Sequence, residues 1–165
     1  MIICYSMIRT YTRIISKKDF MMKKLIGLAA LAFSTSLFAA DVLHNTQWKT
    51  IDDETGKPKA VVEFKQNSDG TLSARIKDLL DPDALKVCND CTGALKGKPM
   101  VGLPIVNRLK LVSKNSYGNG TILDPKSGST YSLKGQLSAD GKKLELRGFK
   151  GVSLLGRNQT WYRIQ

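Results

Sequence analysis

Alternation of apolar and polar residues dominates the chain after residue 45, and residues 71–78, TLSARIKD, show it most clearly. An extended strand places successive side chains on opposite faces. One face here is apolar and the other polar, formed by Leu72, Ala74 and Ile76 and by Thr71, Ser73, Arg75 and Lys77, respectively. This pattern predicts a strand of an antiparallel sheet that is covered on one side and solvated on the other. After residue 40, no segment has apolar residues at helical spacing over ten or more positions.

Eight segments carry this strand pattern, and short turns join most of them. They are residues 46–51, 60–66, 71–78, 107–113, 117–123, 130–137, 143–149 and 159–164. Turn residues separate several of them, as in NSDG before Thr71, DPKSG before Ser129 and the pair Asp140 and Gly141. The pattern predicts an all-β domain with an eight-stranded antiparallel meander, which closes into a barrel or else forms a sandwich.

The strand pattern is interrupted between residues 79 and 104. This stretch holds three prolines, several glycines and the pair Cys88 and Cys91. A structureless loop of this length is uncommon inside a compact domain. We therefore expect a long but ordered loop that a disulfide pins, with a helical turn near residues 82–86.

The N-terminal residues predict export. Residues 22–40 begin with Lys23 and Lys24, continue with a largely apolar run and end in small residues, which is typical of a cleavable secretory signal peptide. The apolar run is shorter than the about 20 residues of a membrane-spanning helix. Residues 1–21 resemble neither a domain nor a signal start, so we expect translation to begin at Met21 or Met22. We therefore expect one domain over residues 41–165, located in the periplasm or outside the cell and without a transmembrane segment.

Charge adds little to this picture. The chain has a net charge of +12, and residues 41–165 carry 20 lysines and arginines against 13 acidic residues, a net charge of +7. A basic surface attracts anionic lipids, lipopolysaccharide or nucleic acid. The basic residues are dispersed, however, and no run of five or six occurs. We therefore expect a solvated surface and no nucleic-acid partner, and we leave open an anionic component of the cell envelope.

Cys88 and Cys91 are the only cysteines after residue 40, and in an oxidising compartment such a pair favours a disulfide. A structural zinc site needs four ligands, and this part of the chain adds only His44. A redox-active CxxC pair stands at the start of a helix, whereas Thr92 and Gly93 follow here without a helical pattern. A thiol-redox enzyme is therefore the weakest alternative, and it predicts an easily reduced pair.

Catalytic groups do not gather in the sequence. His44 lies just after the expected cleavage site, where we expect a mobile segment that is unsuited to a Ser-His-Asp or Cys-His device. The carboxylates of Glu63, Asp78 and Glu145 fall on polar strand faces or at strand ends, as solvated carboxylates do. We expect no catalytic residue, no metal site and no cofactor.

Two motifs resemble a family of secreted bacterial proteins. They are ILDP-x-x-G-x-x-Y over residues 122–131 and LRGF-x-G-x-SLLGR-x-QTW over residues 146–161. Trp48, VVEF and VCNDC precede them in the matching order. Together they resemble the uncharacterised family known as domain of unknown function 2147, over nearly all of residues 41–165. The resemblance implies a lipocalin-like, calycin-type barrel in the periplasm or outside the cell, and no established activity.

The resemblance also implies a structural role for arginines and tryptophans of the first and last strands. In lipocalin-like barrels, a tryptophan near the N-terminus often stacks on an arginine of the closing strand and plugs one end. The corresponding pair here is Trp48 with Arg163 or Arg147. We interpret four residues as closing the barrel, namely Trp48, Arg147, Trp161 and Arg163. Arg157 stands in the glycine-rich turn, and we leave it open as a contact for an anionic ligand group.

The apolar strand faces supply a candidate ligand site. Eight strands enclose either a filled core or room for one small ligand, and residues 88–91 would then form a lid. The candidate ligand-binding residues are Phe64, Leu72, Ile76, Leu133, Leu144, Leu146 and Arg157, and Val62, Leu109 and Leu111 share the same faces. Aromatic residues make up only 7% of the chain, which favours an aliphatic lumen suited to an acyl chain.

These observations lead to two main functional hypotheses. The first is a non-catalytic secreted protein that holds a small apolar or amphiphilic, fatty-acid-like molecule in the barrel lumen. The second is a solid barrel of the envelope, with a structural or interaction role, whose cationic surface contacts anionic partners. A ligand in the lumen would favour the first hypothesis, and a filled interior without a cavity would favour the second.

Overall fold

The structure is a computed structural model that describes residues 39–53 and 55–165. The expected leader, residues 1–21, and residues 22–38 of the expected signal peptide lie outside the described residues. Eight strands follow the N-terminal segment: β1 (Gln47–Ile51), β2 (Pro58–Gln66), β3 (Leu72–Leu79), β4 (Pro104–Ser113), β5 (Ser116–Asp124), β6 (Ser129–Leu137), β7 (Lys143–Phe149) and β8 (Gly156–Arg163).

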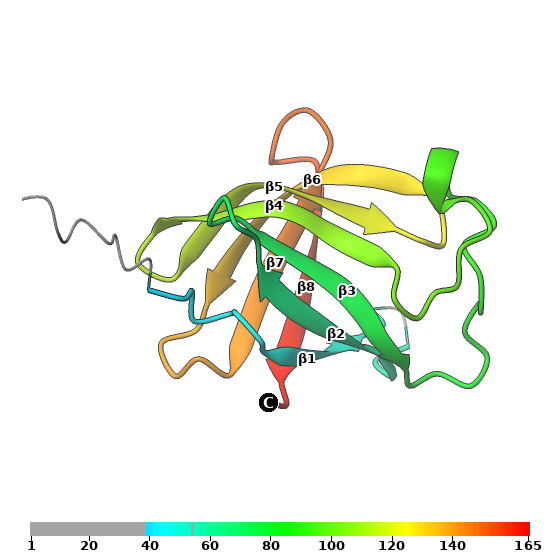
Figure 1. Ribbon diagram of the computed structural model, residues 1–165, viewed down its shortest axis with the longest axis horizontal. Coiled ribbons are helices and arrows are strands. Elements are labelled where there is room, and N and C mark those ends of the chain that lie inside the picture. The colour runs from blue at the N-terminus through cyan, green and yellow to red at the C-terminus, as the bar shows by residue number, and fades with distance from the viewer. Residues whose placement is uncertain (1–38, 54) are drawn as a thin grey trace, which may run out of the picture. The chain divides into compact units, whose positions relative to one another are not determined.

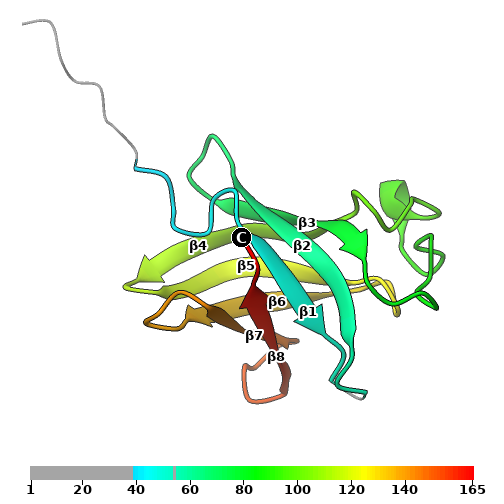
Figure 2. The ribbon, with the colours of Figure 1, turned by 90° about the horizontal axis from the view of Figure 1, so that it is seen from below.

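Each strand pairs antiparallel with the next along the chain, and β1 pairs with β8, so the sheet closes into a barrel (Figures 1 and 2). The predicted eight-stranded antiparallel meander barrel is therefore confirmed. Closure gives every strand two neighbours and removes the exposed edges that invite aggregation. Within the described residues, no helix is long and apolar enough to span a membrane.

The strand limits differ from the predicted ones by up to three residues. Pro58 and Pro104 are the first residues of β2 and β4, a position where the missing proline N–H costs no internal ladder bond. Thr71 was expected on the solvated face of β3, and this is wrong because it lies in the turn and is buried. Its hydroxyl donates a hydrogen bond to Asp69 Oδ1 at 2.6 Å, which closes the β2–β3 turn.

Residues 80–103 form the long ordered loop that the interrupted pattern predicted. Cys88 and Cys91 are joined in a disulfide, and both are buried. The helical turn expected near residues 82–86 is wrong. An isolated turn closed by Ala84 N and Asp81 O lies there, and the short 3₁₀ helix η1 (Gly93–Leu95) instead follows the disulfide.

The loop covers the outer face of the sheet at one end of the barrel. Ile105 and Val106 are adjacent in β4, so their side chains point to opposite faces, yet both are buried. Both belong to one buried cluster that also contains Met100 and Leu103 of the loop. The loop is therefore part of the hydrophobic core.

Candidate functional site: the barrel interior and its two ends

The interior of the barrel is filled by its own side chains. A void large enough for water would expose the side chains that line it, yet the expected lining residues are almost completely covered. The exposed fractions are 0% for Phe64, 1% for Leu72, 5% for Ile76, 2% for Leu133, 0% for Leu144 and 3% for Leu146. Gly135 is so close to its neighbour strand that an added Cβ would lie 2.8 Å from Leu146 Cδ2. The structure thus packs these residues together in the buried core, which favours a solid barrel over a deep ligand-filled lumen.

One of the interior residues expected from the pattern is not inside. Leu111 follows the buried Leu109 by two positions, but it is 54% exposed. It lies near the tip of the β4–β5 hairpin, beyond the residues that fill the barrel. Strand alternation gives the face of a residue, but it does not show where the covered part of that face ends.

Trp48 and Arg163 close one end of the barrel. They are paired across β1 and β8, and the Arg163 guanidinium carbon lies 5.8 Å from the centre of the Trp48 ring. A cation over an indole face is attracted by the ring quadrupole. The buried Trp48 Nε1 donates a hydrogen bond to Thr46 Oγ1 at 2.7 Å, and Trp161 packs beside Phe64 with ring centres 6.1 Å apart.

Arg147 does not reach Trp48, although it was one of the two expected stacking partners. Its guanidinium belongs to the loop between β7 and β8. Nε donates to Ser153 O at 2.7 Å and Nη2 to Leu154 O at 2.9 Å. Nη1 donates to Asn158 Oδ1 at 2.7 Å. Arg147 therefore holds the loop at the opposite end from the Trp48–Arg163 pair.

The N-terminal segment seals the end that Trp48 and Arg163 close. Leu43 is completely buried, and Asn45 N donates to Phe64 O at 3.0 Å. His44 was expected in a mobile segment, but its Nδ1 accepts a hydrogen bond from Gln66 N at 2.9 Å. The segment is fixed because its backbone continues the hydrogen bonding at the ends of β1 and β2.

Tyr117 ties this segment to β5. Its hydroxyl donates to Asp41 Oδ1 at 3.0 Å, and its side chain is among the largest fully buried ones. Burial raises the pKa of Tyr117 well above its ordinary value, and the nearby Asp41 charge and the hydrogen bond raise it further. The pair anchors the N-terminal segment over the sealed end.

We call the opposite end of the barrel, where the loops after β1, β3, β5 and β7 lie, the mouth. Inward positions that continue the buried rows are only partly buried there, namely Ile122, Tyr131, Gly148 and Gln159. Gln159 precedes the buried Trp161 by two positions, and its Oε1 accepts a hydrogen bond from Trp161 Nε1 at 3.2 Å. An added Cβ at Gly148 would lie 3.4 Å from Ile122 Cγ2, which places Ile122 beside it. Inward residues of β5 to β8 are therefore partly exposed at the mouth, whereas the inward Thr50, Ala60 and Ile76 of β1 to β3 stay buried there.

Arg157 stands at the rim of this mouth. It precedes Gln159 by two positions in β8, and its Nε contacts Asp53 Oδ2 at 2.6 Å in an ion pair. The Arg157 side chain is 60% exposed. The rim position leaves part of the guanidinium accessible to a ligand in the mouth, while the carboxylate of Asp53 offsets some of its charge.

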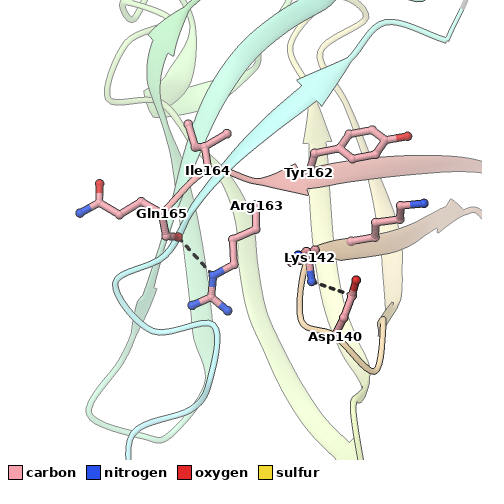
Figure 3. Close-up of a pocket in the computed structure, with 7 residues that line it drawn as sticks. Asp140, Lys142, Tyr162, Arg163, Ile164 and Gln165 are labelled. Carbon is pink, nitrogen blue, oxygen red and sulfur yellow. Dashed lines mark hydrogen bonds between the residues drawn. The ribbon is translucent and has the colours of Figure 1, made fainter.

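A depression of about 530 Å³ lies at the sealed end (Figure 3). It is lined by Asp140, Lys142, Lys143, Tyr162, Arg163, Ile164 and Gln165. Arg163 Nε donates to Gln165 O, and Lys142 N donates to Asp140 Oδ1, so these polar groups bond within the depression. It is open to solvent.

Within the described part of the chain, no three His, Cys, Asp or Glu side chains are grouped in a way that could hold a metal ion. The pattern of apolar and polar residues alone did not mark Ile122, Tyr131 and Gln159 as site residues at the mouth. Each lies two positions from a buried inward residue or pairs with one across the sheet, so strand parity would have found them once the register was known. The sequence itself does not contain that register.

Comparisons with known proteins agree with the fold. A solved structure described as "Protein HP1028 from the human pathogen Helicobacter pylori belongs to the lipocalin family" is similar, with a TM-score of 0.63 and 22% sequence identity. The match covers 72% of this chain and 81% of that one. A comparison with curated proteins finds no match. The sequence profile of "Uncharacterized protein conserved in bacteria (DUF2147)" matches residues 46–163, and the chain therefore belongs to this family, as its motifs indicated.

Proposed function

We propose that this protein is a non-catalytic, exported binding protein that holds the apolar part of a small amphiphilic molecule at the mouth of its barrel. The observation that carries the proposal is the partial exposure of inward residues of β5, β6 and β8 at the mouth. Inward residues are buried around Trp48 and Trp161, and they become partly exposed at Ile122, Tyr131 and Gln159. A small-molecule site is commonly a concave apolar surface with a few polar groups that orient the ligand.

The chemistry of the mouth supports an amphiphile. Ile122 and the ring of Tyr131 offer apolar contact, and Gln159 offers an amide. Arg157 at the rim supports an anionic head group, such as a carboxylate, because a guanidinium donates two parallel hydrogen bonds to it. Such a ligand competes with Asp53 for this arginine, so head-group binding is expected to be modest.

The packed interior of the barrel limits how deeply a ligand can enter. Phe64, Leu144 and Leu146 occupy the lumen below the mouth, and a long acyl chain enters only if they move. The proposal therefore places the ligand in the mouth and near the loops around it. The similar Helicobacter pylori protein belongs to the lipocalin family, which supports a binding role of this general kind.

The test combines native mass spectrometry of the protein purified from the periplasm with titration of a fluorescent fatty acid. We expect a bound amphiphile, or probe binding in the micromolar range or tighter. Ile122→Trp fills the mouth and should weaken probe binding at least about tenfold, whereas Leu111→Trp, on an exposed surface, should not. Arg157→Ala should weaken an anionic probe more than the matching alcohol.

The second candidate is a solid envelope barrel whose cationic surface contacts anionic partners, and the fully buried deep interior favours it. It predicts salt-sensitive binding to lipopolysaccharide. It also predicts that no ligand is bound in the mouth and that Ile122→Trp has no effect. Probe binding that survives Ile122→Trp, or no probe binding at all, would overturn the mouth proposal in favour of this one.

A further inference from the structure

The loop between β7 and β8 carries an exposed apolar tip. The tip consists of Val152, Leu154 and Leu155, which are 62%, 88% and 77% exposed, respectively. Figures 1 and 2 both show this loop projecting from the barrel beyond the strands that it joins. Single exposed aliphatic residues are common, but three within four positions on a protruding loop mark a contact site.

Three carbonyl groups of the tip accept hydrogen bonds from within the protein. Arg147 donates to the carbonyl oxygens of Ser153 and Leu154, and Leu155 N donates to Val152 O at 3.2 Å. Transferring an unpaired carbonyl into an apolar medium is costly, whereas a paired one is tolerated. The loop can therefore move from water into an apolar medium with its aliphatic side chains directed outward and these carbonyl groups still paired. An ordinary solvated turn needs no such arrangement.

Basic residues flank the tip. The segment from Arg147 to Arg157 contains three basic residues and no acidic one. Lys150 lies next to the loop with its Nζ 4.8 Å from the centre of the Tyr131 ring, and Arg157 follows the loop and pairs with Asp53. This arrangement matches one leaflet of an anionic membrane. The aliphatic tip would contact acyl chains, and the cations at its base would lie at the level of the phosphate groups.

We propose that this tip docks onto an anionic lipid bilayer, with Val152, Leu154 and Leu155 inserted at the head-group boundary and Lys150 facing lipid phosphates. A fluid bilayer accepts a small convex tip without a complementary groove, which a protein partner would need to provide. Docking would turn the barrel mouth toward the membrane surface. The inference does not require a ligand in the mouth, because Val152, Leu154 and Leu155 are not mouth residues, although Lys150 lies over the mouth residue Tyr131.

Vesicle co-sedimentation of the purified protein tests this proposal. We expect binding to phosphatidylcholine vesicles that contain phosphatidylglycerol, and at least about tenfold weaker binding to phosphatidylcholine alone. The double variant Leu154→Ser/Leu155→Ser should lose binding to both. The control Leu111→Ser/Val112→Ser removes two exposed aliphatic residues elsewhere, which are 54% and 55% exposed, and should bind normally.

Charge is tested separately with two variants of equal net charge. Lys150→Glu should weaken binding to the anionic vesicles several-fold, whereas Lys114→Glu, in the β4–β5 turn, should not. In the variant Leu154→Trp, brominated lipid should quench the fluorescence of the introduced tryptophan. Trp48 and Trp161 are buried, so their fluorescence should remain unquenched. Equal binding of tip and control variants, or no vesicle binding by the native protein, would overturn the proposal. A native dimer that Leu154→Ser/Leu155→Ser dissociates, without vesicle binding, would instead assign the tip to self-association.

Discussion

At the residue scale, buried polar contacts fix the sealed end of the barrel. The Tyr117 hydroxyl and the Asp41 carboxylate lie 76 positions apart in the chain, yet they form one hydrogen bond over the N-terminal segment. Asp41 Oδ1 also accepts a bond from Leu43 N, which sets the turn that buries Leu43. A hydrogen bond to a charged group is stronger than a neutral one. The pair therefore orders a segment that its sequence alone marks as a loop.

Because of Tyr117, the free energy of unfolding should vary with pH in the alkaline range. Its pKa is raised from the ordinary value of 10.0, mainly by burial, so the folded protein keeps a proton that the unfolded chain loses. This contribution to stability is fully present below pH 10 and is lost as the pH rises above it. Tyr117→Phe should therefore flatten the fall in unfolding free energy above about pH 10, measured by urea titration. The exposed control Tyr162→Phe should keep the native slope, and an unchanged slope in Tyr117→Phe would contradict this assignment.

At the element scale, the long loop of residues 80–103 is held against the β5–β6 turn. Gly128 in that turn has a φ of +66°, and an added Cβ would lie 1.8 Å from Asp90 O between the two cysteines. Glycine is needed here for two reasons, because the backbone is left-handed and because another backbone lies against it. The contact, together with the disulfide, explains why a loop of this length is ordered.

Gly128→Ala should disrupt this contact. Gly70→Ala is its matched control, since Gly70 has a φ of +78° and nothing within 4 Å of an added Cβ. The control should lose about 1 kcal/mol of unfolding free energy from backbone strain alone. Gly128→Ala should lose roughly 1–3 kcal/mol more because the loop must move away. Urea denaturation measures both values, and faster hydrogen exchange across residues 80–103 should appear only in Gly128→Ala. Equal losses of unfolding free energy in the two variants would show that the close approach of Gly128 to Asp90 does not contribute to stability.

At the scale of the whole molecule, all eight strands share one interior. Trp48 of β1, Phe64 of β2 and Leu144 of β7 belong to the same buried cluster, which also takes in the two cysteines of the long loop. Because β1 closes onto β8, no strand leaves the barrel without opening two ladders. The described domain is therefore expected to unfold as a single cooperative unit.

Leu144→Ala should reveal this shared packing. The side chain is completely buried, so its truncation should cost about 2–5 kcal/mol of unfolding free energy. Leu154→Ala, at the exposed tip, should stay within about 0.5 kcal/mol. In the native protein and in each of the two variants, the near-ultraviolet circular dichroism of the buried tryptophans and the far-ultraviolet circular dichroism of the strands should change at the same urea concentration. Separate transitions would contradict a single core.

Much of the fold was predictable because strand alternation is local. The apolar positions of β2, β3 and β7 and the turns at Gly70 and Gly128 follow directly from period-two patterning and from residues that tolerate positive φ. The candidate site was predicted only in part. Alternation correctly placed Phe64, Leu72 and Leu144 on the inner face, but whether an inner face lines a cavity or a solid core depends on how side chains from eight strands fill the same space.

The sequence by itself determined the strands, their inner faces, the barrel class and the pair of cysteines, since each depends on neighbouring residues or on a recognisable motif. Only the tertiary structure decided which groups meet across the chain. It placed Arg163, and not Arg147, over Trp48, because register sets which residues of β1 and β8 face each other. In that structure, Arg147 donates hydrogen bonds to the loop that exposes Leu154 and Leu155. Closure of the barrel is what brings these distant residues together, and no local pattern specifies the distances that result.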